Sequence, residues 1–206
     1  MNASTLTTNQ GLDAGAPQHT SEHGALPLAP LDRPQSWFAR LLFAASRRRY
    51  GMVPTAFRVL YARTPYLGFV SLVLYYGLGR AVALPGELGM LLQLFVATDN
   101  GCTFCADLAL AELVRQRVGT ERFRELTSFQ TSTHFSAREK AALAYARALQ
   151  QSLHVPDAVW SELAAHFDER ERVAIVWTCA VERYFNGMAV PLRIGSDGLA
   201  AGALRP

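Results

Sequence analysis

Helical periodicity runs through almost the whole of this chain, and it is the feature that most constrains the fold. From Arg33 onward, apolar residues recur at intervals of three or four, and no segment shows the two-residue alternation of a half-buried strand. We therefore expect an all-α protein. The expected helices include one that begins near Trp37 and others at residues 55–62, 66–79, 86–97, 101–118, 141–152, 157–166 and 168–187.

Start and stop signals support several of these helices. Ser136 with Glu139, and Asp168 with Glu171, have the spacing of capping boxes, in which each side chain binds the other residue's backbone N–H. Pro85 suits the first position of the helix at 86–97, and Gly119 suits the end of the helix at 101–118.

Length and composition favour one domain with flanking tails. The chain has 206 residues, 50% of them hydrophobic, which is enough to build a complete core. Residues 1–32 are rich in polar and small side chains and are predicted to be a disordered tail. Residues 33–200 would form the helical domain, and residues 201–206 a flexible C-terminus.

Charge and hydropathy exclude two classes of partner. The net charge is only +3, and no ribonucleoprotein, zinc-finger or phosphate-loop motif occurs, so no nucleic acid is expected. Residues 66–79 are apolar but shorter than the roughly 20 residues that span a bilayer. We therefore expect a buried core helix there and no membrane partner.

Cys102 and Cys105 form a CxxC motif at the start of an expected helix. Residues at i and i+3 share one helical face and rise about 4.5 Å along the axis, which is compatible with the Cα separation of a disulfide. Backbone N–H groups of a first helical turn also favour a thiolate. The pair therefore predicts thiol redox chemistry that needs no cofactor.

A structural zinc site is the main alternative for the pair, but the chain has no second CxxC and no HxxxH to complete one, so no metal is expected. The third cysteine, Cys179, lies in a strongly apolar run and is predicted to be a buried thiol. No signal peptide is recognisable, so we expect a reducing, cytoplasmic location.

Several runs together resemble one family, the carboxymuconolactone decarboxylase / alkylhydroperoxidase D superfamily. The resemblance covers about residues 51–199. The runs that carry it are LPGEL (84–88), ATDNGCTFC (97–105), FSAREKAALAYAR (135–147), VPDAV (155–159), HFDERE (166–171) and ERYFN (182–186).

The resemblance implies an alkylhydroperoxidase D-like helical domain that assembles into homo-oligomers. In the thiol branch of the family it also implies reduction of a small-molecule peroxide. Cys105 would attack the peroxide and become a sulfenic acid, and Cys102 would resolve that acid to a disulfide. A dithiol reductant, such as a lipoyl group or a thioredoxin-like protein, would then restore the pair.

The chain departs from the thiol branch at two positions. The family expects a histidine one turn after the second cysteine, where this chain has Ala109, and an upstream glutamate where it has Met90. Glu87, one turn earlier, is a candidate replacement. Asp107 is the one ionisable residue in the turn after Cys105; its charge would disfavour a thiolate, or it is an ordinary helix-start carboxylate.

Other polar residues are weaker candidates. His134, His154 and His166 lie near expected helix ends, where surface or capping roles are usual. Glu182 and Asn186 share a face of an otherwise apolar helix, so they line the thiol site, an oligomer contact or a structural hydrogen-bond network.

The leading hypothesis is a thiol-dependent peroxidase, an oxidoreductase of peroxiredoxin type, acting on organic hydroperoxides. One alternative is a carboxymuconolactone decarboxylase-like enzyme using histidine and acid groups. The other is a non-catalytic oligomeric or binding protein that has kept the scaffold and lost the proton relay.

Overall fold

The predicted all-α fold is confirmed. The computed structural model describes residues 25–78, 82, 84, 87–116 and 121–203, and these residues contain no strand. In chain order the helices are α1 (Trp37–Tyr50), the π-helix η1 (Phe57–Tyr61), α2 (Pro65–Leu72), the π-helix η2 (Val73–Leu78), α4 (Leu88–Asp99), α5 (Thr103–Arg115), α6 (Glu121–Arg124), the 3₁₀ helix η3 (Leu126–Ser128), α7 (Ala137–Gln151), α8 (Asp157–His166), α9 (Glu169–Ala189) and α10 (Leu199–Ala203).

Both predicted capping boxes are confirmed. Ser136 and Glu139 exchange side-chain and backbone hydrogen bonds at the start of α7, and Asp168 and Glu171 do the same at the start of α9. The signals at Pro85 and Gly119 lie outside the described residues, as do residues 1–24 and 204–206 of the two expected tails.

The last residues of the expected N-terminal tail are bound to the domain. Leu31 donates its backbone N–H to the Arg58 carbonyl at 3.0 Å, and Asp32 forms an ion pair with the Arg58 guanidinium at 2.6 Å. Arg63 donates to the Ala29 carbonyl at 2.7 Å.

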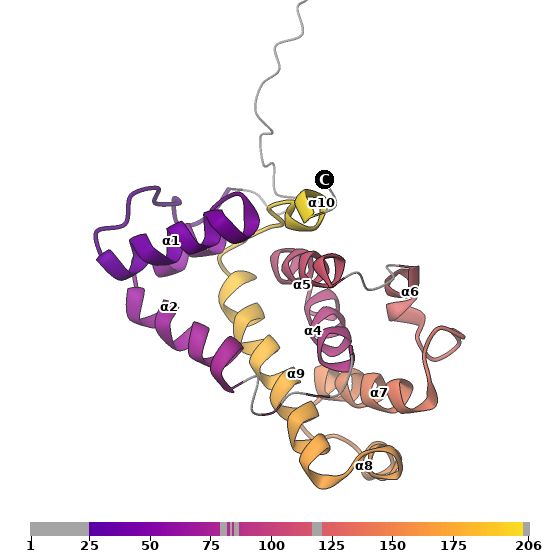
Figure 1. The fold of residues 1–206 in the computed structure, drawn as a ribbon. Helices are drawn as coiled ribbons and strands as arrows, with labels where there is room; N and C mark the ends of the chain where they lie inside the picture. Colours follow the sequence, from indigo (N-terminus) through magenta and orange to yellow (C-terminus); the bar gives the residue numbers. More distant parts are fainter. Residues whose placement is uncertain (1–24, 79–81, 83, 85–86, 117–120, 204–206) are drawn as a thin grey trace, which may run out of the picture.

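The long helix α9 runs between two groups of helices (Figure 1). On one side, α4, α7 and α8 pack with it around a large apolar core that includes Leu91, Phe95 and Leu163. On the other side lie α1 and α2, and α10 sits over α5 near the end of α9. A second core, formed by η1, α5, α10 and the end of α9, encloses Cys102 and Cys105.

The prediction of a buried core helix at residues 66–79 is wrong. In α2 and η2, Tyr66 is 86% exposed, and Phe69, Val70 and Val73 are also exposed. The opposite face of α2 packs closely: a Cβ added at Gly68 would meet the Tyr61 side chain at 3.2 Å, so any larger residue there would require Tyr61 to shift. Within the described part of the chain, no helix is long and apolar enough to cross a membrane.

Candidate active site

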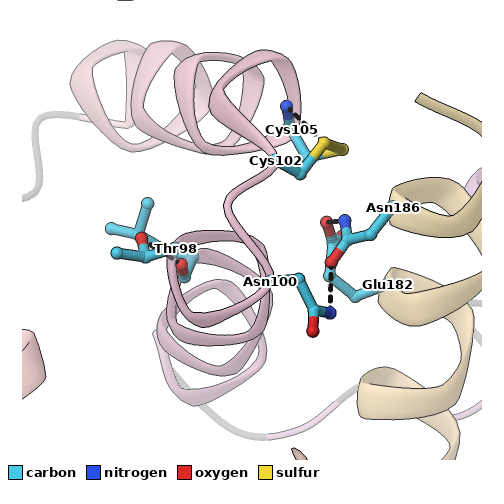
Figure 2. The surroundings of a disulfide bond; sticks show 7 residues. Thr98, Asn100, Cys102, Cys105, Glu182 and Asn186 are labelled. Atoms are coloured by element: carbon cyan, nitrogen blue, oxygen red, sulfur yellow. Dashed lines mark hydrogen bonds between the residues drawn. A yellow bond between two sulfur atoms is a disulfide. The ribbon is translucent and has the colours of Figure 1, made fainter. Parts of the chain in front are cut away.

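A tight turn between α4 and α5 positions the two cysteines. Gly101 takes a φ of 67°, which glycine adopts without strain, and Cys102 then donates its backbone N–H to the Ala97 carbonyl at 2.8 Å. Helix α5 begins at Thr103, immediately after Cys102. The structure joins Cys102 and Cys105 in a disulfide with a Cα–Cα distance of 5.3 Å (Figure 2).

The two sulfurs have different surroundings. Cys102 is the N-cap of α5, and its sulfur accepts the backbone N–H of Cys105 at 3.3 Å. That contact, together with the helix dipole, would favour a Cys102 thiolate once the disulfide is reduced. Cys102 is 1% exposed, whereas Cys105 is 7% exposed and lies on the wall of a cavity.

This cavity, which we call the thiol cavity, has a volume of about 90 Å³ and lies between α5, α9 and the α2–η2 segment. Ala109, where the family expects histidine, lines it. Both π-helices contribute to its wall, in keeping with the frequent occurrence of π-helical turns at functional sites. Its aromatic lining consists of Tyr50, Phe57, Tyr61, Tyr75, Tyr76, Phe104 and Phe185.

Glu182 supplies the carboxyl group of the thiol cavity. It projects from α9 on the side that faces Asn100 and the turn between α4 and α5 (Figure 2), and it is only 6% exposed. Burial raises the pKa of Glu182 to about 7, while a hydrogen bond from Asn186 acts in the opposite direction. Near neutral pH this carboxyl group can therefore both hold and release a proton.

A chain of side-chain amides holds Glu182 in place. Asn186 donates to the Glu182 carboxyl at 2.7 Å, and Asn100 donates to the Asn186 carbonyl oxygen at 2.8 Å. Gln150 of α7 donates in turn to Asn100. The sequence indicates Glu182 and Asn186 as polar residues on an apolar helix. The sequence does not indicate Asn100 and Gln150. Nothing near them in the chain shows that α7, α9 and the end of α4 bring them together.

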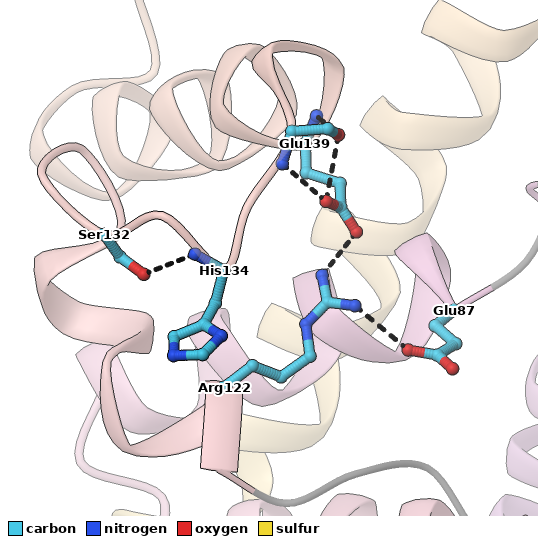
Figure 3. Close-up of polar contacts among 6 residues, drawn as sticks. Glu87, Arg122, Ser132, His134 and Glu139 are labelled. Atoms are coloured by element: carbon cyan, nitrogen blue, oxygen red, sulfur yellow. Dashed lines mark hydrogen bonds and ion pairs between the residues drawn. The ribbon is translucent and has the colours of Figure 1, made fainter.

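The structure does not bring Glu87 to the thiol cavity. Its carboxylate accepts a hydrogen bond from Arg122 at 3.2 Å, and Arg122 also pairs with Glu139 at the start of α7 (Figure 3). Glu87 is therefore part of an ion-pair cluster that joins α4, α6 and α7. Met90, at the family's glutamate position, packs against the main core.

Asp107 also points away from the thiol cavity. Its two carboxylate oxygens accept hydrogen bonds from the Ser196 hydroxyl and from the backbone N–H groups of Asp197, Leu199 and Ala200, at 2.8–3.1 Å. These contacts fix the C-terminal segment and the start of α10 against α5. Asp107 therefore has the contacts of a structural carboxylate, and it is not a partner of the Cys105 sulfur.

Asp107→Ala should lower the free energy of unfolding by about 3 kcal/mol, because four donors lose a buried, charged acceptor. Urea unfolding measures the change. As a control, Asp168→Ala removes an exposed helix cap and should cost about 1 kcal/mol. An equal or smaller loss for Asp107→Ala would contradict the structural role.

The candidate histidines lie elsewhere. His134 lies 3.8 Å from Glu125, and His166 lies 3.2 Å from Glu162 on the surface of α8. His154 is exposed, and no histidine is among the described residues that line the thiol cavity. No group of three His, Cys, Asp or Glu side chains in the described ranges could hold a metal ion.

Comparisons with known proteins show which proteins share sequence and fold with this chain. The carboxymuconolactone decarboxylase family model matches residues 73–148, a region that includes the CxxC motif. Within these residues the chain is similar to the carboxymuconolactone decarboxylase / alkylhydroperoxidase D-like superfamily. It is also 30% identical over 88 residues to the uncharacterized protein YdfG of Bacillus subtilis (strain 168). That match covers 42% of this chain and 60% of YdfG.

Two solved structures share the fold. One is the alkylhydroperoxidase AhpD core of an uncharacterized peroxidase-related protein from Ralstonia eutropha JMP134. Its TM-score is 0.65 at 19% identity, and the match covers 88% of this chain and all of the Ralstonia chain. The other is the debrominase Bmp8, as a cysteine-to-alanine variant in complex with 2,3,4-tribromopyrrole. Its TM-score is 0.71 at 19% identity, over 87% of this chain and 96% of that one. At this identity the likenesses establish the fold alone.

Proposed function

We propose that this protein is a thiol-dependent peroxidase that reduces organic hydroperoxides through Cys105 and Cys102. The observation that carries the proposal is the thiol cavity, where one sulfur of the cysteine pair meets an apolar pocket. Among the described residues that line it, Glu182 is the one with a carboxyl group. The aromatic lining suits the organic part of a hydroperoxide better than it suits hydrogen peroxide, which is small and strongly hydrated.

In the proposed reaction each group has one task. The Cys105 thiolate attacks the outer oxygen of the hydroperoxide, so that an S–O bond forms as the O–O bond breaks. The leaving alkoxide takes a proton from Glu182 and departs as an alcohol, and Cys105 becomes a sulfenic acid. Cys102 then loses its thiol proton and attacks the Cys105 sulfur as a thiolate. The disulfide forms as the S–O bond breaks, and the departing hydroxide takes up that proton and leaves as water.

The helix start suits Cys102 for the second step. Its sulfur is already beside that of Cys105 and accepts a first-turn backbone N–H, which stabilises it as a thiolate. A dithiol, such as a lipoyl group or a thioredoxin-like protein, would return the disulfide to two thiols by exchange, and its oxidation completes the cycle.

Counting free thiols tests the proposal. The fully reduced chain has three, and an equivalent of an organic hydroperoxide such as cumene hydroperoxide should leave one, Cys179. Cys179 is fully buried, and burial raises the pKa of its thiol to about 12, so it should stay reduced. One molecule of alcohol should form for each pair of thiols lost. No thiol loss, or loss without alcohol, would refute the peroxidase.

A second candidate reaction is the reductive removal of a halogen from an aromatic ring. The ring-lined cavity favours it, and the fold is shared with a debrominase that binds a bromopyrrole. Two thiols and an aryl halide would give the disulfide, the hydrogen-bearing arene and a hydrogen halide. In the same thiol assay, halide release from a bromopyrrole with no reaction of the hydroperoxide would favour this candidate.

A further inference from the structure

The first two helices expose a broad apolar surface. On α1, Trp37 is 74% exposed and Leu41 is 58% exposed, and the two residues lie one helical turn apart. On α2 and η2, the exposed residues Tyr66, Phe69 and Val73 repeat at the same spacing. The Phe38 ring contacts both Trp37 and Phe69, at centroid distances of 6.0 Å, so the two stripes adjoin. We call this surface the basic aromatic face.

The ionisable side chains of this region that are charged near neutral pH are all arginines, although Asp32, just before it, pairs with Arg58. Between residues 33 and 78 the sequence contains no aspartate and no glutamate, but it contains seven arginines: Arg33, Arg40, Arg47, Arg48, Arg49, Arg58 and Arg63. Arg40 and Arg48 fall on the same side of α1 as Trp37 and Leu41, and both are exposed. Among the described residues, Arg47 and Arg48 have no carboxylate partner, whereas Arg49 pairs with Glu112.

From this combination we infer that the basic aromatic face docks on the surface of an anionic lipid bilayer. Tryptophan and tyrosine rings favour the headgroup region of a bilayer, and arginines beside them are attracted to anionic headgroups. A second copy of the chain is a poorer occupant. A symmetric contact would place this arginine-rich surface against itself without any carboxylate of the same segment to neutralise it.

The docking surface lies next to the thiol cavity. Gly68 and Leu72, on the other side of α2, line the cavity wall, and Tyr76 both lines the cavity and is 42% exposed. Docking would therefore hold the cavity wall formed by α2 and η2 close to the lipid headgroups. The sequence excluded residues 66–79 as a membrane-spanning segment, but lying on a bilayer surface requires no such length.

Flotation of the full chain with lipid vesicles tests the inference without any assay of enzymatic activity, so it fails or succeeds independently of the peroxidase proposal. The protein should float with vesicles of equal parts phosphatidylglycerol and phosphatidylcholine, and at least about tenfold less with phosphatidylcholine alone. Molar salt should release it, because the attraction to headgroups is screened.

Variants then locate the surface. The double variant Tyr66→Ser/Phe69→Ser should reduce vesicle affinity by about tenfold or more, and Arg48→Gln by about fivefold. The matched controls are Leu153→Ser, at another exposed apolar residue, and Arg124→Gln, at another exposed arginine; neither should change affinity. Unfolding midpoints show that each variant is folded.

Three outcomes would overturn the inference. The first is no flotation with the anionic vesicles, and the second is equal flotation with both vesicle types. The third is equal losses from the face variants and their controls. If the wild type fails to float and Tyr66→Ser/Phe69→Ser lowers its molar mass in light scattering, the face is instead a contact between copies of the chain.

Discussion

Cys105→Ser should lower the rate of hydroperoxide reduction by at least about a thousandfold, because it removes the nucleophile that opens the O–O bond. Serine is close in size to cysteine, so the fold should persist and circular dichroism should be unchanged. Stopped-flow mixing of the reduced protein with cumene hydroperoxide measures the loss directly.

Cys102→Ser should behave differently, and the contrast assigns the two roles. Its Cys105 thiol remains next to the thiol cavity, so the first turnover should proceed and leave a sulfenic acid that a dimedone-type probe captures. Without a resolving thiol, later turnovers should stop. Cys179→Ala serves as the matched control and should keep its rate within about twofold, since Cys179 is a buried core residue. A captured sulfenic acid on Cys102 in the Cys105→Ser variant would reverse the assignment.

Local signals in the sequence predicted local structure well. The capping boxes at Ser136 and Asp168 form as expected, because the bonding groups lie within one turn of each other. The CxxC pair closes for the same reason, since three residues at a helix start fix the separation of its Cα atoms.

Long-range arrangements could not be predicted in the same way. Glu87 and Glu182 are both glutamates of apolar helices, but only the packing of α4 against α6 and α7 turns Glu87 toward Arg122, and only α9 places Glu182 in the thiol cavity. The apolar run at 66–79 likewise does not reveal which of its faces another helix covers. Periodicity identifies a helix without indicating what lies beside it.

Glu182→Gln should lower the rate of hydroperoxide reduction by roughly 10²–10⁴-fold at pH 6, because glutamine cannot give a proton to the leaving alkoxide. Glutamine preserves the size of the side chain and an oxygen that can accept the hydrogen bond from Asn186. In the wild type, kcat/KM should fall as the pH rises through about 7, the value to which burial raises the pKa of Glu182. The variant should lack this descending limb.

The same substitution should change how stability depends on pH. Because the pKa of Glu182 is about 7 in the folded chain and 4.5 ordinarily, the folded state binds this proton more tightly than the unfolded state. The stabilisation is complete below pH 4.5 and is lost as the pH rises through 7, a change of about 3 kcal/mol. Glu182→Gln should remove that part of the pH dependence in urea unfolding.

Two further carboxylates complete the experiment. Glu162→Gln, at an exposed carboxylate of α8, is the matched control and should leave the rate and its pH profile unchanged. Glu87→Gln distinguishes the two glutamate candidates: the sequence favoured Glu87, whereas the structure pairs it with Arg122. A loss of rate and of the descending limb in Glu87→Gln, with Glu182→Gln unaffected, would move the proton donor to Glu87 and out of the thiol cavity. Retention of the descending limb in Glu182→Gln would exclude Glu182 as its source, since no other described carboxylate lines that cavity.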